Sequence, residues 1–169
     1  MTERNRKCVF AGTFDPPTLG HKAIVEGCLG MFDEVVLCLM VNPNKKPLFT
    51  EEERREMLAL TFKEEPRITV KSFSGTVAEL LKRENTRYYV RGLRNGSDFD
   101  YENANFYASR KLDKEIVAVY LPCPQELLHV SSSMVRSSLA FKTPIDEYVA
   151  QEVKEYIEKK FQNQSSMKR

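Results

Sequence analysis

One turn of the sequence concentrates residues that control the backbone and ends in a histidine. The stretch "GTFDPPTLGH" (12–21) holds two glycines, two adjacent prolines and one of only two histidines in the chain. Gly12 would let the chain turn out of a preceding strand, the prolines fix φ, and Thr18 is a good helix N-cap. Free N–H groups at the start of the next helix suit phosphate, to which His21 could donate a hydrogen bond, with Gly20 leaving room. Taken alone, the stretch is also typical of an ordinary capped turn.

Two further segments supply cations. "NPNKKPLFTEEE" (42–53) carries Lys45 and Lys46 between prolines, and lysine binds phosphate as a point charge; a solvated basic loop is the alternative. "RGLRNGSDFDYE" (91–102) carries Arg91 and Arg94, whose guanidinium groups could clamp a polyphosphate. The acidic residues that follow could orient these arginines or form only a salt-bridge network at a helix start.

A serine triplet forms a third candidate for anion binding. "HVSSSMVRSS" (129–138) places Ser131, Ser132 and Ser133 at an expected helix start, where hydroxyls and free N–H groups together make an anion cradle. One serine would be an ordinary cap, but three exceed what capping needs. His129 has no partner signature, and we interpret it as structural. The G-x-S-x-G elbow, the G-x-x-x-x-G-K-[ST] loop and the G-x-G-x-x-G fingerprint are all missing from the sequence.

Apolar runs alternate with amphipathic segments along the chain. Strands are expected over 7–12, 34–41, 67–73, 87–92 and 116–122, and helices over 20–32, 50–62, 76–84, 98–112, 131–141 and 145–161. Thr50 and Glu53 form a capping box, Asp98 is the expected cap of 98–112, and 162–169 is expected to be a frayed tail. This alternation predicts an α/β fold in one domain, residues 1–169. Its core would be a Rossmann-like, doubly wound, five-stranded parallel sheet with flanking helices and a C-terminal helical segment.

The candidate phosphate-binding residues all follow the carboxyl ends of expected strands. Both histidines, Lys45, Lys46, Arg91, Arg94 and the serine triplet lie there, whereas the opposite ends hold ordinary turns such as "KEEPR". Ligands of doubly wound sheets bind at that edge. The sequence therefore predicts one functional edge that takes an anionic ligand.

Composition limits the classes of partner. The net charge is +2 with 30% charged residues, so no strong field favours nucleic acid or membrane, and neither is expected as a partner. No apolar run approaches the ~20 residues of a membrane span, and the N-terminus lacks the pattern of a signal peptide. The four cysteines are far apart and only two histidines exist, which argues against a zinc site or a disulfide scaffold. We expect reduced thiols and a cytoplasmic location.

The segments "GTFDPPTLGH", "NKKPLFTEEER", "RGLRNGSDFDYE" and "VSSSMVR", in this order, resemble those of the T/H-x-G-H nucleotidylyltransferases. More closely, they are similar to the bacterial phosphopantetheine adenylyltransferase family, from about Cys8 to Phe161. The resemblance implies adenylyl transfer from ATP to 4′-phosphopantetheine, giving dephospho-coenzyme A and pyrophosphate. It also implies Mg²⁺ carried by the ATP phosphates without protein ligands, coenzyme A as a feedback inhibitor, and a homohexamer.

The resemblance also assigns residues by position. The implied ATP site comprises Thr13, Phe14, His21, Gly92, Leu93, Arg94, Glu102, Leu127, Leu128, His129, Val130, Ser131, Ser132 and Ser133. The implied pantetheine-phosphate site comprises Thr13, Lys45, Val77 and Arg91. The implied catalytic roles are these: His21 stabilises the α-phosphate, Lys45 and Thr13 hold the attacking phosphate, and Arg94 with the serines holds the leaving pyrophosphate.

Some positions depart from the family pattern. Ala11 stands where proline is common and Leu19 where asparagine is frequent, and Asn105 and Ser109 fall where the pantetheine arm is usually contacted.

An attacking phosphate monoester has a second pKa near ~6 and is already anionic at neutral pH, so the reaction needs no general base.

Two other readings remain. A nicotinate-mononucleotide adenylyltransferase or a glycerol-phosphate cytidylyltransferase would tend to carry threonines where this chain has "VSSS", and would lack R-G-L-R. A nucleotide-binding regulator without catalysis would usually have lost some of the candidate site residues. All of them are intact here: Thr13, His21, Lys45, Arg91 and Arg94.

Overall fold

The computed structural model describes residues 6–41 and 46–166. Its core is a five-stranded sheet in which all neighbours pair in parallel, in the order β3-β2-β1-β4-β5. The strands are β1 (Lys7–Gly12), β2 (Glu34–Met40), β3 (Ile68–Phe73), β4 (Tyr88–Leu93) and β5 (Val117–Pro122). Every bound falls within one residue of the sequence-based expectation, and the predicted doubly wound α/β class is confirmed.

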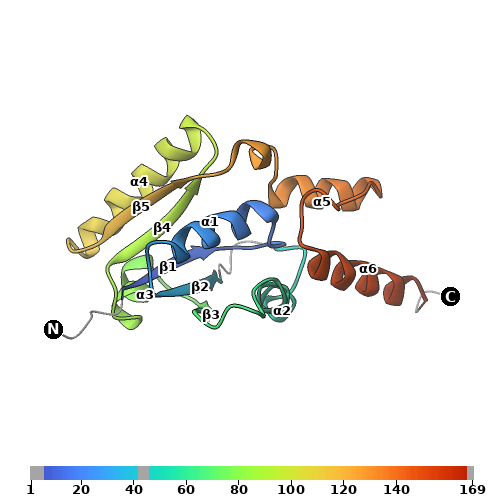
Figure 1. Ribbon diagram of the computed structural model, residues 1–169, viewed down its shortest axis with the longest axis horizontal. Coiled ribbons are helices and arrows are strands. Elements are labelled where there is room, and N and C mark those ends of the chain that lie inside the picture. Colours follow the sequence, from blue (N-terminus) through green and yellow to red (C-terminus); the bar gives the residue numbers. More distant parts are fainter. Residues whose placement is uncertain (1–5, 42–45, 167–169) are drawn as a thin grey trace.

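Helices cover both faces of this sheet (Figure 1). They are α1 (Leu19–Leu29), α2 (Glu51–Thr61), α3 (Val77–Arg83), α4 (Gly96–Leu112), α5 (Ser132–Phe141) and α6 (Gln151–Ser166), with a 3₁₀ turn, η1 (Gln125–Leu127), before α5. Successive residues of a strand point to opposite faces. Cys8 and Phe10 of β1 therefore pack with α1 on one face, and Val9 and Ala11 pack with α3 on the other.

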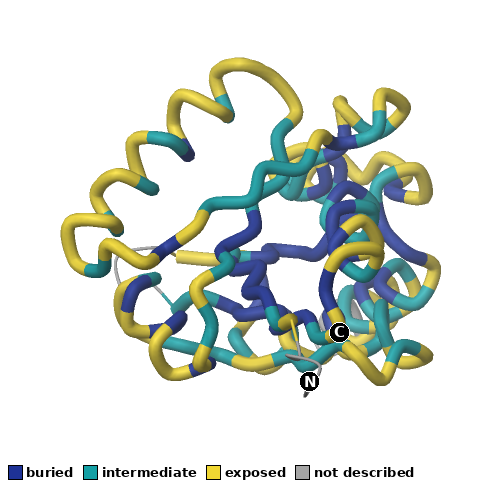
Figure 2. The backbone as a smooth tube through the Cα atoms, turned by 60° about the vertical axis from the view of Figure 1, so that its left-hand side comes forward, coloured by how far each residue is buried: buried dark blue, intermediate teal, exposed yellow. Residues whose placement is uncertain are grey.

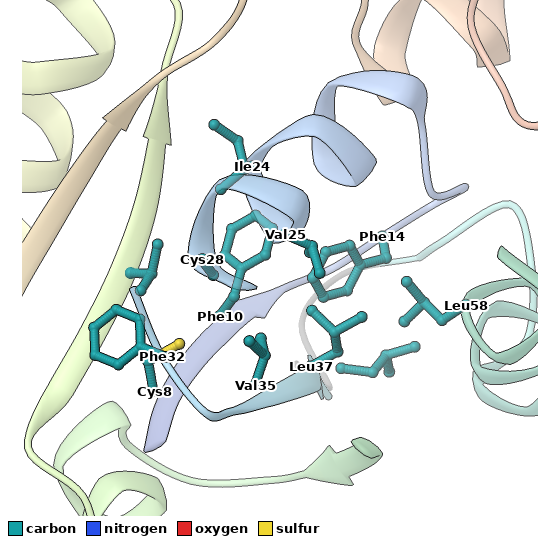
Figure 3. Close-up of a cluster of buried hydrophobic side chains, with 12 residues drawn as sticks. Cys8, Phe10, Phe14, Ile24, Val25, Cys28, Phe32, Val35, Leu37 and Leu58 are labelled. Atoms are coloured by element: carbon teal, nitrogen blue, oxygen red, sulfur yellow. The ribbon is translucent and has the colours of Figure 1, made fainter. Parts of the chain in front are cut away.

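The face under α1 holds the cluster that supports the loop after β1. Figure 3 shows Ile24 and Val25 of α1 lying over Phe10, with the ring of Phe14 beside them. These side chains are buried. The loop after β1 is thus anchored by an aromatic ring that belongs to the sheet core.

The C-terminal helices form a separate apolar cluster with α2. Met57 of α2 packs with Val135 of α5 and with Val153 and Ile157 of α6, and all four are buried. An ion pair joins Lys160 of α6 to Glu53 of α2. This cluster holds α5 beside the carboxyl edge of the sheet, so it places the serine triplet near the end of β1.

Helix α4 lies at the outside of the molecule, with most of its residues exposed (Figure 2). Glu102 is its one buried residue among those described. Tyr101, Tyr107 and Leu112 are each more than half exposed, at 67%, 58% and 66%. The side of α4 that faces away from the sheet is therefore unusually rich in exposed apolar surface.

Several helix ends differ from expectation. Helix α1 ends at Leu29, before the expected residue 32, because Gly30 caps it. Helix α4 starts at Gly96 with Asn95 as its cap, since the Asn95 side chain accepts the N–H of Asp98 at 2.9 Å. Asp98 is therefore not the cap. The capping boxes at Thr18 and Thr50 are present.

The last helix also differs from expectation. Helix α6 begins only at Gln151 and continues to Ser166, so residues 145–150 precede the helix. Residues 145–150 are used in packing: Ile145 and Val149 are buried, and the Tyr148 carbonyl accepts the N–H of Leu19 at 2.9 Å. Within the described residues, none of the helices has the length and apolarity that a membrane-spanning helix requires.

Candidate active site

A cavity of about 560 Å³ opens at the carboxyl edge of the sheet, where β1 and β4 lie side by side. The chain winds away from this point in opposite directions, which is where doubly wound sheets bind ligands. Predicted site residues that line the cavity are Thr13, Phe14, His21, Arg91, Gly92, Arg94, Glu102, Val130, Ser131, Ser132 and Ser133. A wider hollow of about 970 Å³ between α3 and the start of β4 contains none of the predicted site residues.

His21 occupies the third position of α1, and its ring closes the capping box with Thr18. The ring atom Nδ1 accepts the backbone N–H of Thr18 at 3.0 Å, so in the neutral imidazole the proton is on Nε2. Burial lowers the pKa of His21 to about 4, and the positive charges of Arg91 and Arg94 act in the same direction. His21 is therefore a neutral Nε2–H donor in the cavity wall at physiological pH.

Phe14 explains why residue 12 is glycine. Its ring is buried and lies edge-on to the rings of His21 and Phe10, at centroid distances of 5.0 and 5.6 Å. A Cβ on Gly12 would lie 3.2 Å from this ring. Gly12 is the last residue of β1, and its φ is not positive. It is Phe14 that adopts a left-handed φ of 48°.

The carbonyl groups of the same loop are held by side chains from distant helices. Arg54 of α2 donates to the Thr13 carbonyl at 2.8 Å. Arg136 of α5 donates to the Asp15 carbonyl at 2.7 Å, and Ser132 donates to the Pro16 carbonyl at 2.8 Å. These three hydrogen bonds constrain the loop without any ligand, and preorganisation of this kind lowers the cost of binding.

The buried Asp15 carboxylate ties this loop to the segment before α2. It accepts the backbone N–H groups of Leu48 and Phe49 at 2.8 and 2.9 Å. Arg136 lies 3.8 Å from the same carboxylate. Asp15 thus supports the cavity wall and has little capacity left for a ligand.

The two arginines after β4 are oriented by acids of α4. Arg94 donates to Asp98 through Nε at 2.9 Å and Nη2 at 3.2 Å, and these hydrogen bonds lower the pKa of Asp98. Arg91 is paired with Glu102 and donates to the Ala11 carbonyl at 2.5 Å. The acids after R-G-L-R therefore form salt bridges that hold the two arginines in the wall of the cavity.

Each serine of the triplet has a different task. Ser131 caps α5 by accepting the N–H of Met134 at 3.1 Å. Ser132 holds the loop after β1, and Ser133 accepts a hydrogen bond from Arg136 at 3.0 Å. The backbone N–H groups of Ser132 and Ser133 are at the open end of α5, as that of Gly20 is in α1. Two helix N-termini thus converge on one cavity and present N–H groups suited to an anion.

Some predicted residues lie away from this cavity. Lys45 falls outside the described residues. Leu93, Val77, Leu127, Leu128 and His129 are not part of the lining. His129 is exposed, with its ring 6.0 Å from that of Tyr148. On α4, the Ser109 hydroxyl donates to the Asn105 carbonyl at 3.0 Å, and neither residue reaches the cavity.

Sequence reasoning missed four residues of the site: Asp15, Arg54, Cys123 and Arg136. Asp15, Cys123 and Arg136 line the cavity. Asp15 and Arg136 lie inside the segments "GTFDPPTLGH" and "VSSSMVR". Their place beside the predicted site residues is the signal that could have identified them. Arg54 follows the capping box of α2 and gave no signal beyond its charge. Its partner, the Thr13 carbonyl, is 41 residues away.

Comparisons with known proteins agree with this geometry. Residues 9–138 match the cytidylyltransferase-like family. The chain is 41% identical over 134 residues to the phosphopantetheine adenylyltransferase of Flavobacterium johnsoniae, covering 79% of this chain and 88% of that protein. It is 36% identical over 155 residues to the enzyme of the same name from Clostridium tetani, covering 92% and 97%.

A solved structure shows the same fold. It is the crystal structure of a Vibrio parahaemolyticus chain provisionally assigned as a nicotinate-nucleotide adenylyltransferase, with a TM-score of 0.69 and 20% identity. The match covers 91% of this chain and 92% of that one. Together with the two sequence matches, the cavity at the β1–β4 switch point leads to one assignment: the chain belongs to the cytidylyltransferase-like family and, within it, to the phosphopantetheine adenylyltransferases.

Proposed function

We propose that the protein transfers the adenylyl group of ATP to the phosphate of 4′-phosphopantetheine, forming dephospho-coenzyme A and pyrophosphate. The observation that carries this proposal is the neutral Nε2–H of His21 in a cavity flanked by two helix N-termini and two acid-oriented arginines. This is a site built to bind phosphates and to stabilise added negative charge. The names of the sequence relatives supply the acceptor.

The transfer needs positioning more than proton movement. An oxygen of the acceptor phosphate attacks the α-phosphorus, the bond to the bridging oxygen breaks, and its electron pair leaves with pyrophosphate. The acceptor is already anionic near neutral pH, since its second pKa is near ~6. In our proposal His21 donates to the α-phosphate, and Arg94 with the N–H groups of α5 neutralises the leaving pyrophosphate. Thr13, Arg91 and Lys45 hold the attacking phosphate.

We propose that Mg²⁺ enters on the phosphates of ATP, where it would neutralise charge during transfer. The acids of the cavity support this arrangement because each is already engaged. Asp15 accepts two backbone N–H groups, Asp98 pairs with Arg94, and Glu102 pairs with Arg91. Within the described residues, no cluster of three metal-ligating side chains occurs.

The function is tested by pyrophosphate release from ATP with three arms: 4′-phosphopantetheine, nicotinate mononucleotide, and no acceptor. Release only with 4′-phosphopantetheine is the expected result. Activity confined to nicotinate mononucleotide would overturn the proposed acceptor. Binding of ATP without turnover of either acceptor would identify a nucleotide-binding regulator.

We further propose a homohexamer located in the cytoplasm, with coenzyme A as a feedback inhibitor that competes for the substrate site. The exposed apolar side chains of α4 support an assembly, because surface of this kind usually contacts a partner. The four buried free thiols suit a reducing compartment. Light scattering should give six times the 19.5 kDa chain mass. Added coenzyme A should raise the apparent KM for 4′-phosphopantetheine.

A further inference from the structure

Arg54 is a buried arginine beside the site, and it lacks an acidic partner. Only 4% of it is exposed, and no carboxylate in residues 6–41 and 46–166 forms an ion pair with it. The three arginines that line the cavity all have an acid nearby: Arg91 with Glu102, Arg94 with Asp98, and Arg136 with Asp15. A buried charge is costly unless something compensates it. An anion bound in the neighbouring cavity would do so.

The contacts of Arg54 are directed at one peptide group of the cavity wall. Its Nε donates to the Thr50 carbonyl of its own helix at 3.3 Å, and Nη1 donates to the Thr13 carbonyl at 2.8 Å. The Thr13–Phe14 peptide bond is trans, so its N–H, which belongs to Phe14, points away from its carbonyl and therefore from Arg54. A cation on the carbonyl also polarises the peptide and makes its N–H a stronger donor.

The Phe14 N–H is an unused hydrogen-bond donor in a residue of the cavity wall. It forms no hydrogen bond within the part of the chain that the structure describes, and Thr13 and Phe14 both line the cavity. Within residues 13–16, the other two carbonyls held by side chains are those of Asp15 and Pro16, which precede prolines and so belong to peptides without an N–H. Of these three peptides, whose carbonyls accept hydrogen bonds from Arg54, Arg136 and Ser132, only the one bound by Arg54 has an N–H that can donate to a ligand.

The backbone at Phe14 also requires support. Its φ of 48° is a left-handed conformation, which a residue with a side chain adopts only where the surroundings enforce it. Such conformations produce concave N–H arrangements that bind anions. Arg54 lies on the side of the peptide opposite the N–H, where it enforces this conformation.

We propose that Arg54 is a positioning residue for phosphate binding. It fixes and polarises the Thr13–Phe14 peptide so that the Phe14 N–H meets a phosphate oxygen, and it places an uncompensated positive charge behind that peptide. This inference rests on the proposed function only in taking the ligand to be a polyphosphate such as that of ATP. It does not depend on the identity of the acceptor.

The test compares Arg54→Met and Arg54→Gln with the control Arg55→Met, the same change at the exposed neighbouring arginine of α2. Titration calorimetry with ATP and with inorganic tripolyphosphate measures Kd. We expect Kd to rise roughly 10- to 100-fold in Arg54→Met, the range for a lost charge-assisted hydrogen bond. Arg54→Gln, which can still donate to the Thr13 carbonyl, should show a smaller rise, and Arg55→Met none. In Arg54→Ala, millimolar guanidinium but not tetramethylammonium should restore affinity, which a merely structural role would not produce.

Amide hydrogen exchange of the unmutated protein gives a second readout that needs no variant to fold. The Phe14 amide should exchange fast in the free protein and slow down when tripolyphosphate is added. An amide that stays unprotected overturns the proposal. The proposal is also overturned if Kd for ATP and tripolyphosphate is unchanged in folded Arg54→Met or in folded Arg54→Gln. Because both measurements concern polyphosphate binding alone, they are independent of the turnover assay with 4′-phosphopantetheine that tests the proposed function.

Discussion

The Nδ1 atom of His21 lies 3.0 Å from the backbone nitrogen of Thr18 and accepts its hydrogen bond. In most capping boxes a glutamate or glutamine at the third helical position makes this contact; here a histidine makes it. The two ring nitrogens are thereby separated in function. Nδ1 completes the start of α1, and Nε2 is left to donate into the cavity.

The separate roles of Nδ1 and Nε2 predict the results of two substitutions of His21. Asparagine can place an oxygen near the position of Nδ1, so His21→Asn should keep the cap and Tm but lower kcat roughly 10²- to 10³-fold. Glutamine is itself a capping-box residue and can also place an N–H near the position of Nε2, so His21→Gln should keep the cap and Tm and retain more turnover than His21→Asn. Steady-state kinetics and thermal unfolding measure both, with His129→Asn as the matched control. Normal turnover in folded His21→Asn would contradict the mechanism.

The lowered pKa of His21 predicts how stability depends on pH. Its pKa is about 4 in the folded protein and about 6.5 in an unfolded chain. Between these values the unfolded state binds more protons, so the free energy of unfolding decreases as pH falls from about 6.5 toward 4. Above pH ~6.5 His21 has no effect. Urea unfolding of wild type and His21→Asn at about pH 7 and about pH 5 should show the smaller loss in the variant; equal losses would mean that His21 is protonated in the native state.

Gly92 has a packing role that a methyl group would disrupt. A Cβ at Gly92 would lie 2.7 Å from Cγ1 of Ile24, whereas a Cβ at Gly96 has nothing within 4 Å. Gly92→Ala should therefore push α1 away from β4 and cost roughly 1–3 kcal/mol, while Gly96→Ala should be neutral or slightly stabilising. Chemical unfolding measures both. In a double-mutant cycle Ile24→Ala should relieve much of the Gly92→Ala cost, and strictly additive losses would disprove the clash.

The pairing of Glu102 with Arg91 predicts local stability in α4. Glu102 is the buried contact of this helix, and Glu102→Gln leaves Arg91 without its charge partner at a cost of about 1–3 kcal/mol. Because Glu102 is the one buried residue of α4 among those described, the loss should appear as faster amide exchange over residues 96–112 rather than as global unfolding. Asp100→Asn, at an exposed position on the same helix, is the control. Equal exchange rates in Glu102→Gln and Asp100→Asn would show that α4 is held in another way.

Local sequence signals were enough to predict the sheet. The buried runs that become β1 and β2 are apolar on both faces, since Val9 and Phe10 both reach a core, and such runs are typical of parallel strands. The start of a helix was harder to predict where two candidate N-cap residues lie close together in the sequence. Asn95 and Asp98 are both good caps, and Arg94 decides between them by engaging the Asp98 carboxylate.

The site was predictable only where one segment carries its own chemistry. The stretch containing His21 and the R-G-L-R pair were found because their spacing is local. Arg54 and Arg136 contact the first loop across 41 and 121 residues, and no pattern in the sequence indicates such pairs. The different hydrogen bonds of the three serines could not be predicted either, because the partner of Ser132, the Pro16 carbonyl, is 116 residues away.

The bond between Arg136 and Asp15 joins the loop after β1 to a helix 121 residues further along the chain. A growing chain can pair β1 with β2 early, but the N–H groups of α5 and the Arg136 side chain arrive only after all five strands have been made. The cavity is therefore completed only once α5 has been synthesised, and before then its wall lacks the N–H groups of α5 and the hydrogen bond from Arg136. Since closing contacts across such long separations is slow, ligand binding should also report on the last step of refolding.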